Sequence, residues 1–331
     1  MPPTAATSDS ELERWARRQV GADVLQWQAI PGDASPRRYH RLVCDGHSRV
    51  LMDASAEPAS CAAFAAVASL LREAGVHAPE VLAWERSRGW MLLEDLGQRG
   101  YLEALRHEPP GPLIEAALTA LVRWQASSRP GVLPAYDRTR LAAELALFPD
   151  WYVTRHLGRA LTPAQRRTWD EVADALVTAA LAQAQVFVHR DFMARNLLVG
   201  AIGPGVIDFQ DAVYGPVTYD VASLLRDAFI SWPDDQTRAW ALCYWEKARR
   251  AGIAVPAQPE DFLRDLDWMG TQRHLKVLGI FARLKHRDGK PHYLEEAPRF
   301  RGYLDAAIRR HGDLAPLGTL LAALHADAGA A

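Results

Sequence analysis

The sequence predicts an α+β fold in which a small sheet with one inserted helix precedes a larger, mainly helical part. Three observations support this prediction. Strand-like segments with turn signals crowd into the first hundred residues. Amphipathic helical spacing dominates from Pro112 onward. Three short apolar stretches then interrupt the helices, beginning at Val186, and polar side chains gather around them. We therefore expect two domains, residues 1–97 and residues 98–331.

Residues typical of turns and helix caps indicate where the helices and strands of the first domain begin and end. Asp45-Gly46 is a strong signal for a tight hairpin, and Gly75 suits the position after a helix end. Ser8 and Glu11 are spaced as a capping box. The predicted elements are helices at 8–20 and 57–74 and strands at 39–44, 48–53, 79–84 and 90–94.

The second domain is predicted to consist of helices around three short strands. Pro163 follows Thr162 and suits the first position of a helix. The predicted helices cover 112–127, 139–148 and 163–185, and helices resume from Tyr219 to near the end. The apolar stretches between them are 186–188, 197–199 and 206–207.

Composition excludes several classes of protein. The chain has 331 residues, 49% of them hydrophobic, and a formal net charge of −2, which argues against nucleic acid as a partner. No apolar run is long enough to span a membrane, and the N-terminus does not resemble a signal peptide. The three cysteines are far apart, which favours neither disulfides nor a zinc site. We expect a cytoplasmic protein without nucleic-acid or membrane partners.

The most informative segment runs from Val186 to Val199 and is followed by a strand that ends at Asp208. His189 and Asp191 follow an apolar strand and lie in a predicted turn, and Asn196 lies at the far end of that turn. One carboxylate and two oxygen ligands at the ends of short strands suit phosphoryl transfer. Asp191 would accept the proton of a substrate hydroxyl, while Asn196 and Asp208 would hold Mg²⁺.

Each of these residues has an ordinary structural interpretation. Asp and Asn are common in turns, and a His before a turn is often only a hydrogen-bonded structural group. The joint spacing, His-x-Asp-x₄-Asn followed by an apolar strand that ends in Asp-Phe, favours a catalytic site. The metal position also holds Asn196, the only asparagine in the chain.

This segment resembles the catalytic loop and metal-binding Asp of the aminoglycoside phosphotransferase-like superfamily, distant relatives of protein kinases that include choline and homoserine kinases. The resemblance extends from the Asp45-Gly46 hairpin to about Tyr303. It implies a two-lobed protein-kinase-like fold, with a small antiparallel-sheet N-lobe and a larger helical C-lobe. It also implies ATP as co-substrate, Asp191 as catalytic base, and Asn196 and Asp208 as Mg²⁺ ligands.

The resemblance assigns further roles. His189 and Asp220 would support the catalytic loop, although Asp220 could also be a helix N-cap. Glu94 to Leu96 would form the hinge between the lobes, whose backbone groups recognise the adenine of ATP. The stretch between Asp208 and Asp220 leaves no room for an activation segment, so we expect a small-molecule substrate rather than a protein.

The chain departs from the family at the phosphate-binding lysine. No lysine precedes Lys247, and alignment puts Met52 at that position and Val50 against adenine. We expect an arginine near the start of the hairpin to replace the charge, because a guanidinium can bind phosphate through two hydrogen bonds. These arginines could equally be solvated or paired with Asp33 or Asp53. The residues predicted to bind ATP are Ser35, Arg37, Arg38, Arg41, Val50, Glu94 and Leu96.

The missing lysine opens a second class of function, a catalytically inactive regulator that binds nucleotide. The intact base and metal ligands favour an active enzyme instead.

The substrate has to be inferred from the C-terminal part. Residues 271–292 are rich in Arg and Lys, and a stripe at helical spacing could bind a sugar and its anion. The same stripe could be the solvated face of a helix, and Trp151–Tyr152 could stack on a sugar or pack in the core. The residues predicted to bind substrate are Trp151, Gln272, Arg273, Lys276 and Arg283.

Several longer segments resemble one subfamily, the anomeric N-acetylmuramate/N-acetylglucosamine kinases of bacteria. The segments begin at Phe148, His189, Asp208, Leu225 and Gln272. The resemblance implies phosphorylation of the C1 hydroxyl of an amino sugar in peptidoglycan recycling. Aminoglycosides, choline and other hydroxyl compounds remain alternative substrates. We expect a monomer.

Overall fold

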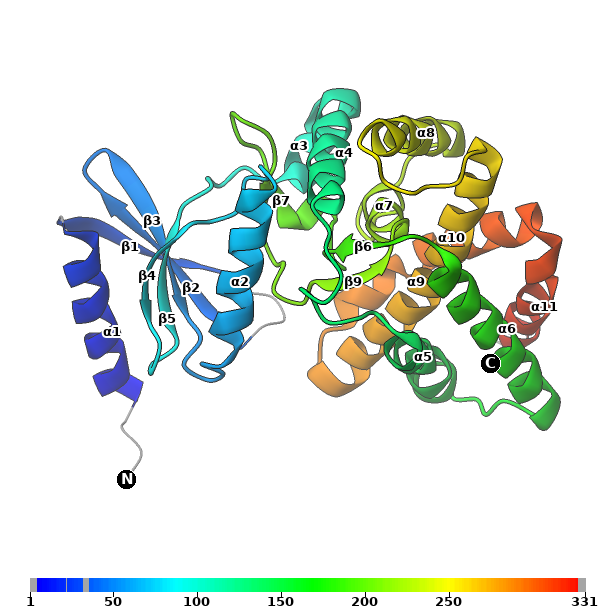
Figure 1. The fold of residues 1–331 in the computed structure, drawn as a ribbon. Helices are drawn as coiled ribbons and strands as arrows, with labels where there is room; N and C mark the ends of the chain where they lie inside the picture. The colour runs from blue at the N-terminus through cyan, green and yellow to red at the C-terminus, as the bar shows by residue number, and fades with distance from the viewer. Residues whose placement is uncertain (1–4, 22, 32–35, 327–331) are drawn as a thin grey trace. The chain divides into compact units, whose positions relative to one another are not determined.

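The computed structural model describes residues 5–21, 23–31 and 36–326, which form two compact units (Figure 1). The sheet unit comprises Met1–Gly100 and Leu197–Asp211, and the helical unit comprises Tyr101–Asn196 and Ala212–Ala331. The predicted class, an antiparallel sheet followed by a larger helical part, is confirmed. The division differs from the expected one, because residues 197–211 return to the sheet unit.

The described part of the sheet unit contains a five-stranded antiparallel sheet in the order β1-β2-β3-β5-β4. Its strands are β1 (Val24–Ile30), β2 (Arg38–Cys44), β3 (His47–Asp53), β4 (Val81–Glu85) and β5 (Trp90–Glu94). The strand β1 was not predicted from the sequence. It is an edge strand whose apolar residues do not all face the core, since Leu25 is exposed. The hairpin predicted at Asp45-Gly46 is confirmed, with Gly46 at a φ of 73°.

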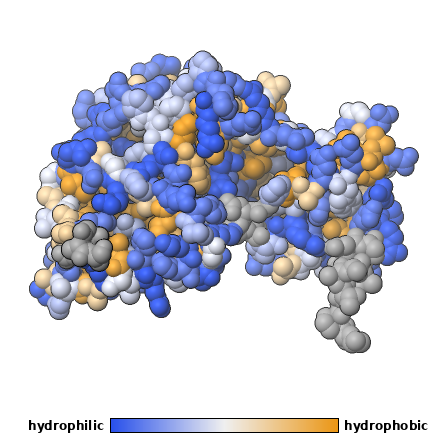
Figure 2. All heavy atoms as spheres, turned by 180° about the vertical axis from the view of Figure 1, so that it is seen from behind, coloured by the Kyte–Doolittle hydropathy of each residue, from blue (hydrophilic) through white to orange (hydrophobic). Residues whose placement is uncertain are grey.

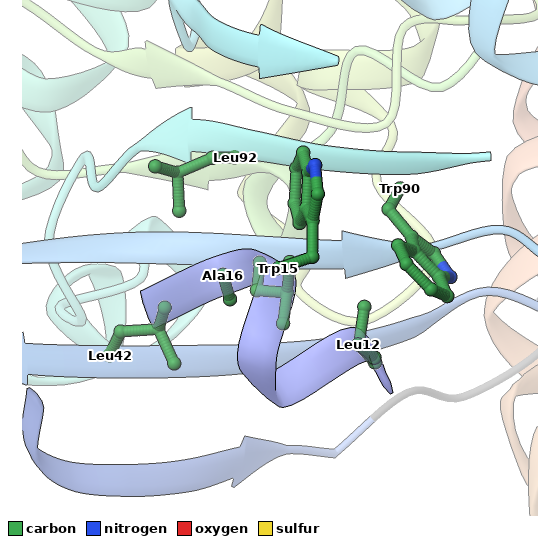
Figure 3. Packing of buried hydrophobic residues seen from close by; sticks show 7 residues of the cluster. Leu12, Trp15, Ala16, Leu42, Trp90 and Leu92 are labelled. Carbon is green, nitrogen blue, oxygen red and sulfur yellow. The ribbon is translucent and has the colours of Figure 1, made fainter. Parts of the chain in front are cut away.

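One helix packs on each face of this sheet (Figure 1). The helix α1 (Ala5–Val20) starts before the predicted residue 8, and the side chain of Ser8, placed in a capping box, lies outside the described residues. Buried side chains of α1 meet those of the strands in a hydrophobic cluster (Figure 3). This cluster comprises Leu12, Trp15, Ala16, Leu42, Leu51, Trp90 and Leu92. The helix α2 (Ser60–Glu73) covers the opposite face.

A short hairpin explains why residues 197–211 belong to the sheet unit. It consists of β7 (Leu197–Leu198) and β8 (Gly205–Val206), which pair antiparallel. Isolated bridges connect Leu198 to Gly100 and Gly205 to His77. The hairpin lies close to Leu96, because a Cβ at Gly205 would be 3.0 Å from the Cδ1 atom of that side chain.

The helical unit is built around a long helix, α9, and a two-stranded antiparallel sheet. The sheet consists of β6 (Gln185–Val188) and β9 (Val213–Pro216). The longer helices are α4 (Pro110–Ala126), α5 (Arg138–Leu147), α6 (Pro163–Ala182), α8 (Asp234–Arg250), α9 (Pro259–Asp288), α10 (Ala297–Arg310) and α11 (Ala315–His325). Shorter helices are α3 (Tyr101–His107), α7 (Tyr219–Leu225), a π-helix η1 (Phe148–His156) and the 3₁₀ turns η2 (Ala194–Asn196), η3 (Pro291–Glu296) and η4 (Gly312–Leu314). The cap predicted at Thr162 is confirmed as a full capping box.

The helix α9 packs against α5, α6, α7 and α10. At Gly279 the backbone of Leu147 approaches so closely that a Cβ would overlap its carbonyl carbon. Gly279 therefore serves helix packing, and the residue that follows Leu147 begins the π-helix η1.

The surface visible in Figure 2 is mostly hydrophilic, with hydrophobic side chains in scattered patches. Among the helices of the described ranges, none combines the length and the apolar character needed to cross a membrane.

Candidate active site

The turn that carries Asp191 follows β6 in the helical unit. A buried carboxylate, that of Asp220 in α7, accepts hydrogen bonds from the backbone N–H groups of His189 (2.7 Å) and Arg190 (3.0 Å). Asp220 thus lies where it can brace the loop, and the N-cap of α7 is Thr218. Burial raises the pKa of Asp220 to about 7, although these two N–H donors lower it.

The second half of the turn is fixed in the same manner. The carbonyl oxygen of Asp191 accepts hydrogen bonds from the backbone N–H of Met193 and from Nδ2 of Asn196, both at 2.9 Å. The N–H of Ala194 donates to the buried carboxylate of Asp227 at 2.8 Å. Burial also raises the pKa of Asp227. Two buried carboxylates therefore hold the backbone of the loop, one on each side of Asp191.

The structure brings Asp191 and Asn196 together in the helical unit, and Asp208 belongs to the sheet unit. Asp208 follows β8 with a φ of 65°, a left-handed conformation that is uncommon for a residue with a side chain. Gln210 donates a hydrogen bond to its Oδ1 atom at 3.0 Å. The neighbouring Phe209 packs on Phe64 of α2, with ring centroids 4.8 Å apart. The chain is thus anchored immediately beside the predicted metal ligand.

Each predicted metal ligand has the chemistry that a hard cation prefers. Asn196 offers an amide oxygen in the helical unit, and Asp208 offers a carboxylate in the sheet unit. The hydrogen bond from Nδ2 of Asn196 to Asp191 orients the amide, with its nitrogen toward the loop.

Two of the three arginines predicted to bind phosphate pair with carboxylates of the sheet unit. Arg41 donates to both carboxylate oxygens of Asp95, from Nε to Oδ2 at 2.6 Å and from Nη2 to Oδ1 at 3.0 Å, and Nη2 also donates to the carbonyl oxygen of Gly97. Arg38 pairs with Asp53 at 2.6 Å, one of the alternatives considered from the sequence. The positive charges of Arg38 and Arg41 are thus balanced by carboxylates within the sheet unit.

Arg37 lies beside Tyr39. Burial raises the pKa of Tyr39, and the nearby Arg37, which is hydrogen-bonded to the Tyr39 hydroxyl, acts in the opposite direction. The charge of Asp208 also acts on Tyr39 and raises its pKa. Arg37 and the predicted metal ligand Asp208 therefore both lie near the same side chain of the sheet unit. Ser35 lies outside the described residues.

The predicted hinge follows β5. The backbone N–H of Glu94 donates to the carbonyl oxygen of Glu80, and the Glu94 carboxylate pairs with Arg72 at 3.1 Å. Val50 of β3 pairs in register with Leu93 of β5. Met52, at the position of the family lysine, is fully buried.

The predicted substrate residues of α9 are more buried than a solvated face would be, so that alternative is wrong. Gln272, Arg273 and Lys276 are all buried. Lys276 pairs with Glu144 at 3.1 Å, and the charge of Arg273 acts on Asp220 and Asp227. Neither amide atom of Gln272 has a hydrogen-bond partner among the described residues.

Two other predicted substrate residues are partly exposed. Arg283 is half-buried, and its Nε atom is buried without a partner in the described part of the chain. Trp151 is half-buried in η1, whereas the adjacent Tyr152 is buried and stacks on Phe148 with centroids 5.3 Å apart. Core packing is therefore the role of Tyr152.

The sequence reading missed three residues near Asp191. They are Glu144, Arg190 and Asp227. Asp227 follows a helix end, and Arg190 lies inside the recognised motif, so both could have been considered. Glu144 sits in an ordinary amphipathic helix, and nothing local in the sequence marks it.

The chain is similar to a known protein family and to several named proteins. Residues 26–258 match the model of the phosphotransferase enzyme family. The N-acetylmuramate/N-acetylglucosamine kinase of Pseudomonas aeruginosa is 52% identical over 292 residues, which is 88% of this chain and 86% of that protein. The protein of the same name from Neisseria meningitidis is 47% identical over 322 residues, 96% of each chain.

Solved structures show the same fold at low identity. An ADP-bound aminoglycoside phosphotransferase of the (2″)-Ib type is 14% identical, with a TM-score of 0.61 over 88% of this chain and 96% of that one. The choline kinase of Cryptosporidium parvum is 12% identical, with a TM-score of 0.61 over 89% and 92% of the two chains. The resemblance inferred from the motifs is confirmed, and the chain belongs to the phosphotransferase enzyme family.

Proposed function

We propose that this phosphotransferase is an ATP- and Mg²⁺-dependent kinase that transfers phosphate to the C1 hydroxyl of N-acetylmuramate and N-acetylglucosamine. The observation that carries the proposal is the pair of bacterial relatives, which are named N-acetylmuramate/N-acetylglucosamine kinase and match 88% and 96% of this chain. The C1 hydroxyl is the position implied by the resemblance to the subfamily. The site supports a kinase, because a braced turn presents a carboxylate of suitable chemistry to accept a hydroxyl proton.

In this proposal Asp191 takes the proton from the sugar hydroxyl as the oxygen attacks the terminal phosphorus of ATP, while the bond from that phosphorus to the β,γ-bridging oxygen breaks and ADP leaves. Asn196 and Asp208 each supply an oxygen ligand for Mg²⁺, which when bound neutralises charge on the transferred phosphoryl group. The hydrogen bonds to Asp220 and Asp227 hold the loop before substrate arrives, so less ordering is needed during the reaction.

Arg37 is the arginine that we propose as the replacement for the missing lysine. Arg38 and Arg41 are already paired with carboxylates of the sheet unit. Releasing either of them would leave Asp53 or the nearly buried Asp95 without its partner, which would cost free energy. Arg37 lies near Tyr39, a side chain on which the charge of the predicted metal ligand Asp208 also acts, and a guanidinium can bind phosphate oxygens directly.

For the lactyl carboxylate of N-acetylmuramate, we propose Arg283 as the recognising cation. Lys276 is balanced by Glu144, and Arg273 lies among the carboxylates that hold the catalytic loop. Arg283 keeps a buried Nε donor without a partner among the described residues. Such a donor gains a full hydrogen bond when an anion binds.

Phosphorus NMR of the product tests the proposed function. The purified protein is given Mg²⁺ and ATP with N-acetylmuramate, N-acetylglucosamine, kanamycin or choline. We expect an anomeric phosphate from both sugars and no product from kanamycin or choline. A phosphomonoester at C6, or turnover of kanamycin or choline in place of the sugars, would reject the proposal. No turnover with any acceptor would support an inactive nucleotide-binding protein.

A further inference from the structure

A carboxylate that the proposed reaction does not use lies in a buried cluster of the helical unit. It belongs to Glu144 of α5, which packs beside α9 (Figure 1). Its Oε1 atom accepts a hydrogen bond from the guanidinium of Arg190. Its Oε2 atom accepts one from the hydroxyl of Tyr136 and pairs with Nζ of Lys276 at 3.1 Å. Both oxygens of Glu144 are thus occupied.

The environment keeps this carboxylate ionised. Burial alone would raise the pKa of Glu144, but Lys276 and Arg190 outweigh it and hold the pKa below its usual value. Lys276 in turn donates to the hydroxyl of Tyr219 at 2.9 Å. The cluster therefore presents Arg190 with a fixed negative charge rather than a neutral acceptor.

Arg190 connects this cluster to the catalytic turn. It directly precedes Asp191 and has a φ of 76°, a left-handed conformation that is unfavourable for a residue with a Cβ. Its backbone N–H is held by Asp220 at 3.0 Å, and its guanidinium lies 5.7 Å from the ring centroid of Tyr136. The strained conformation persists because both the backbone and the side chain are held.

We propose that Glu144 is a positioning residue of the reaction. By binding the guanidinium of Arg190, it holds Arg190 in its left-handed conformation and so directs the carboxylate of Asp191. Glu144 itself contacts neither substrate nor nucleotide in this role. The inference rests on the proposed role of Asp191 as the base. The competing interpretation is that Glu144 only stabilises the core through its ion pairs.

A double-mutant cycle separates the two interpretations, because glycine adopts positive φ without strain. The variants are E144Q, R190G and the pair together, with R190A for comparison and the exposed E171Q as control. We expect E144Q to lower kcat by about 10- to 100-fold, as for a lost charge-assisted hydrogen bond, with KM for ATP within about twofold. R190G should retain more activity than R190A. In the R190G background, E144Q should lower kcat by less than about threefold further.

Several outcomes would overturn the inference. One is an equal loss from E144Q in both backgrounds, which would show that Glu144 does not act through Arg190. Another is a lower melting temperature of E144Q with unchanged kcat, which would make the role structural. An R190G variant as inactive as R190A would show that the left-handed backbone is not what Glu144 maintains.

The measurement also has to be independent of the sugar assignment. The cycle is therefore repeated on the slow hydrolysis of ATP by water in the absence of sugar. If the wild-type protein phosphorylates neither amino sugar, the proposed function fails, and the cycle can still be read from hydrolysis. If sugar phosphorylation is normal and the coupling between Glu144 and Arg190 is absent in both assays, only the present inference fails.

Discussion

The two units place their charged side chains in different ways. In the sheet unit, one charge pair can be read directly from the strand register. Arg38 stands directly opposite Asp53 in the β2–β3 ladder and pairs with it. Arg41 of β2 is an exception, because it pairs with Asp95, which follows β5, and β5 is not a neighbour of β2.

In the helical unit, charged partners come from segments that are remote in the sequence. Glu144 of α5 binds Arg190 and Lys276, and Asp220 of α7 binds the turn after β6. The carboxylates of Glu144 and Asp220 are buried or nearly so. Removing one partner of a buried charge pair lowers the free energy of unfolding more than removing one at the surface. We therefore expect that substitution of a buried, paired charge lowers the free energy of unfolding more than substitution of a charge at the surface.

The largest expected effect is on the base. Asp191→Asn should lower kcat by about 10²- to 10⁴-fold, because the amide cannot accept the hydroxyl proton. Binding of Mg²⁺ and ATP should survive, as measured by calorimetry. The exposed Asp150→Asn serves as the control and should retain wild-type turnover. If Asp191→Asn retains more than about a tenth of wild-type kcat, Asp191 is not the base.

The second effect concerns stability in the helical unit. Asp267 is buried and binds Arg226, Arg310 and His311. Asp267→Ala should lower the free energy of unfolding by about 3–5 kcal/mol, because Arg226, whose side chain is only 7% exposed, is left buried and unpaired.

The matched control for Asp267 is a surface pair. Asp313 is 72% exposed and pairs with Arg264 at 3.2 Å. Asp313→Ala should change the free energy of unfolding by no more than about 1 kcal/mol. Denaturant unfolding of both variants measures the difference. Equal losses would contradict the contrast between buried networks and surface pairs.

The third effect concerns how stability depends on pH, because Asp220 and Asp95 should contribute with opposite signs. Burial raises the pKa of Asp220 to about 7, so its contribution to stability is fully present below the unfolded pKa of about 3.9 and is lost as pH rises toward 7. Burial would also raise the pKa of Asp95, but the hydrogen bonds from Arg41 and Ser48 outweigh it and hold the pKa below its usual value. The contribution of Asp95 is therefore present above about 3.9 and is lost as pH falls through its folded pKa.

Unfolding of Asp220→Asn and Asp95→Asn from pH 3 to pH 8 measures these contributions. The stability of the wild type relative to Asp220→Asn should fall with rising pH, and that relative to Asp95→Asn should rise. Slopes of the same sign would show that Asp220 and Asp95 do not differ in this way.

The fourth effect tests the arginine of the sheet unit. Arg37→Ala should raise the KM for ATP by an amount worth about 2 kcal/mol, because a charge-assisted contact with phosphate is lost. The control is Arg88→Ala, since Arg88 is half-exposed and pairs with Glu11 at 3.1 Å. An unchanged KM for ATP in Arg37→Ala would mean that another group replaces the family lysine.

The smallest expected effect is on sugar selectivity. Arg283→Gln should raise the KM for N-acetylmuramate about tenfold, or ~1.4 kcal/mol, and leave that for N-acetylglucosamine unchanged. The control is Arg287→Gln, because Arg287 is exposed and pairs with Asp288. Steady-state kinetics with both sugars measures the ratio, and an equal change for both would remove Arg283 as the carboxylate contact.

Features that depend on neighbouring residues could be predicted from the sequence. The hairpin at Asp45-Gly46 and the cap at Thr162 rest on the preferences of residues that are adjacent in the chain. The turn with Asp191 and Asn196 was found in the same way, because its residues lie within one short motif. The edge strand β1 was missed, since its exposed residues weaken the apolar alternation.

By itself, the sequence determined the order of sheet and helices and the chemical groups of the turn that carries Asp191 and Asn196. Only the tertiary structure decided which charges are already balanced. Arg41 and Lys276 looked available for phosphate or substrate, yet each is paired with a carboxylate from a distant segment. The physical reason is that a charge interacts with whatever the fold brings within a few ångströms of it, and residue order does not specify that neighbour.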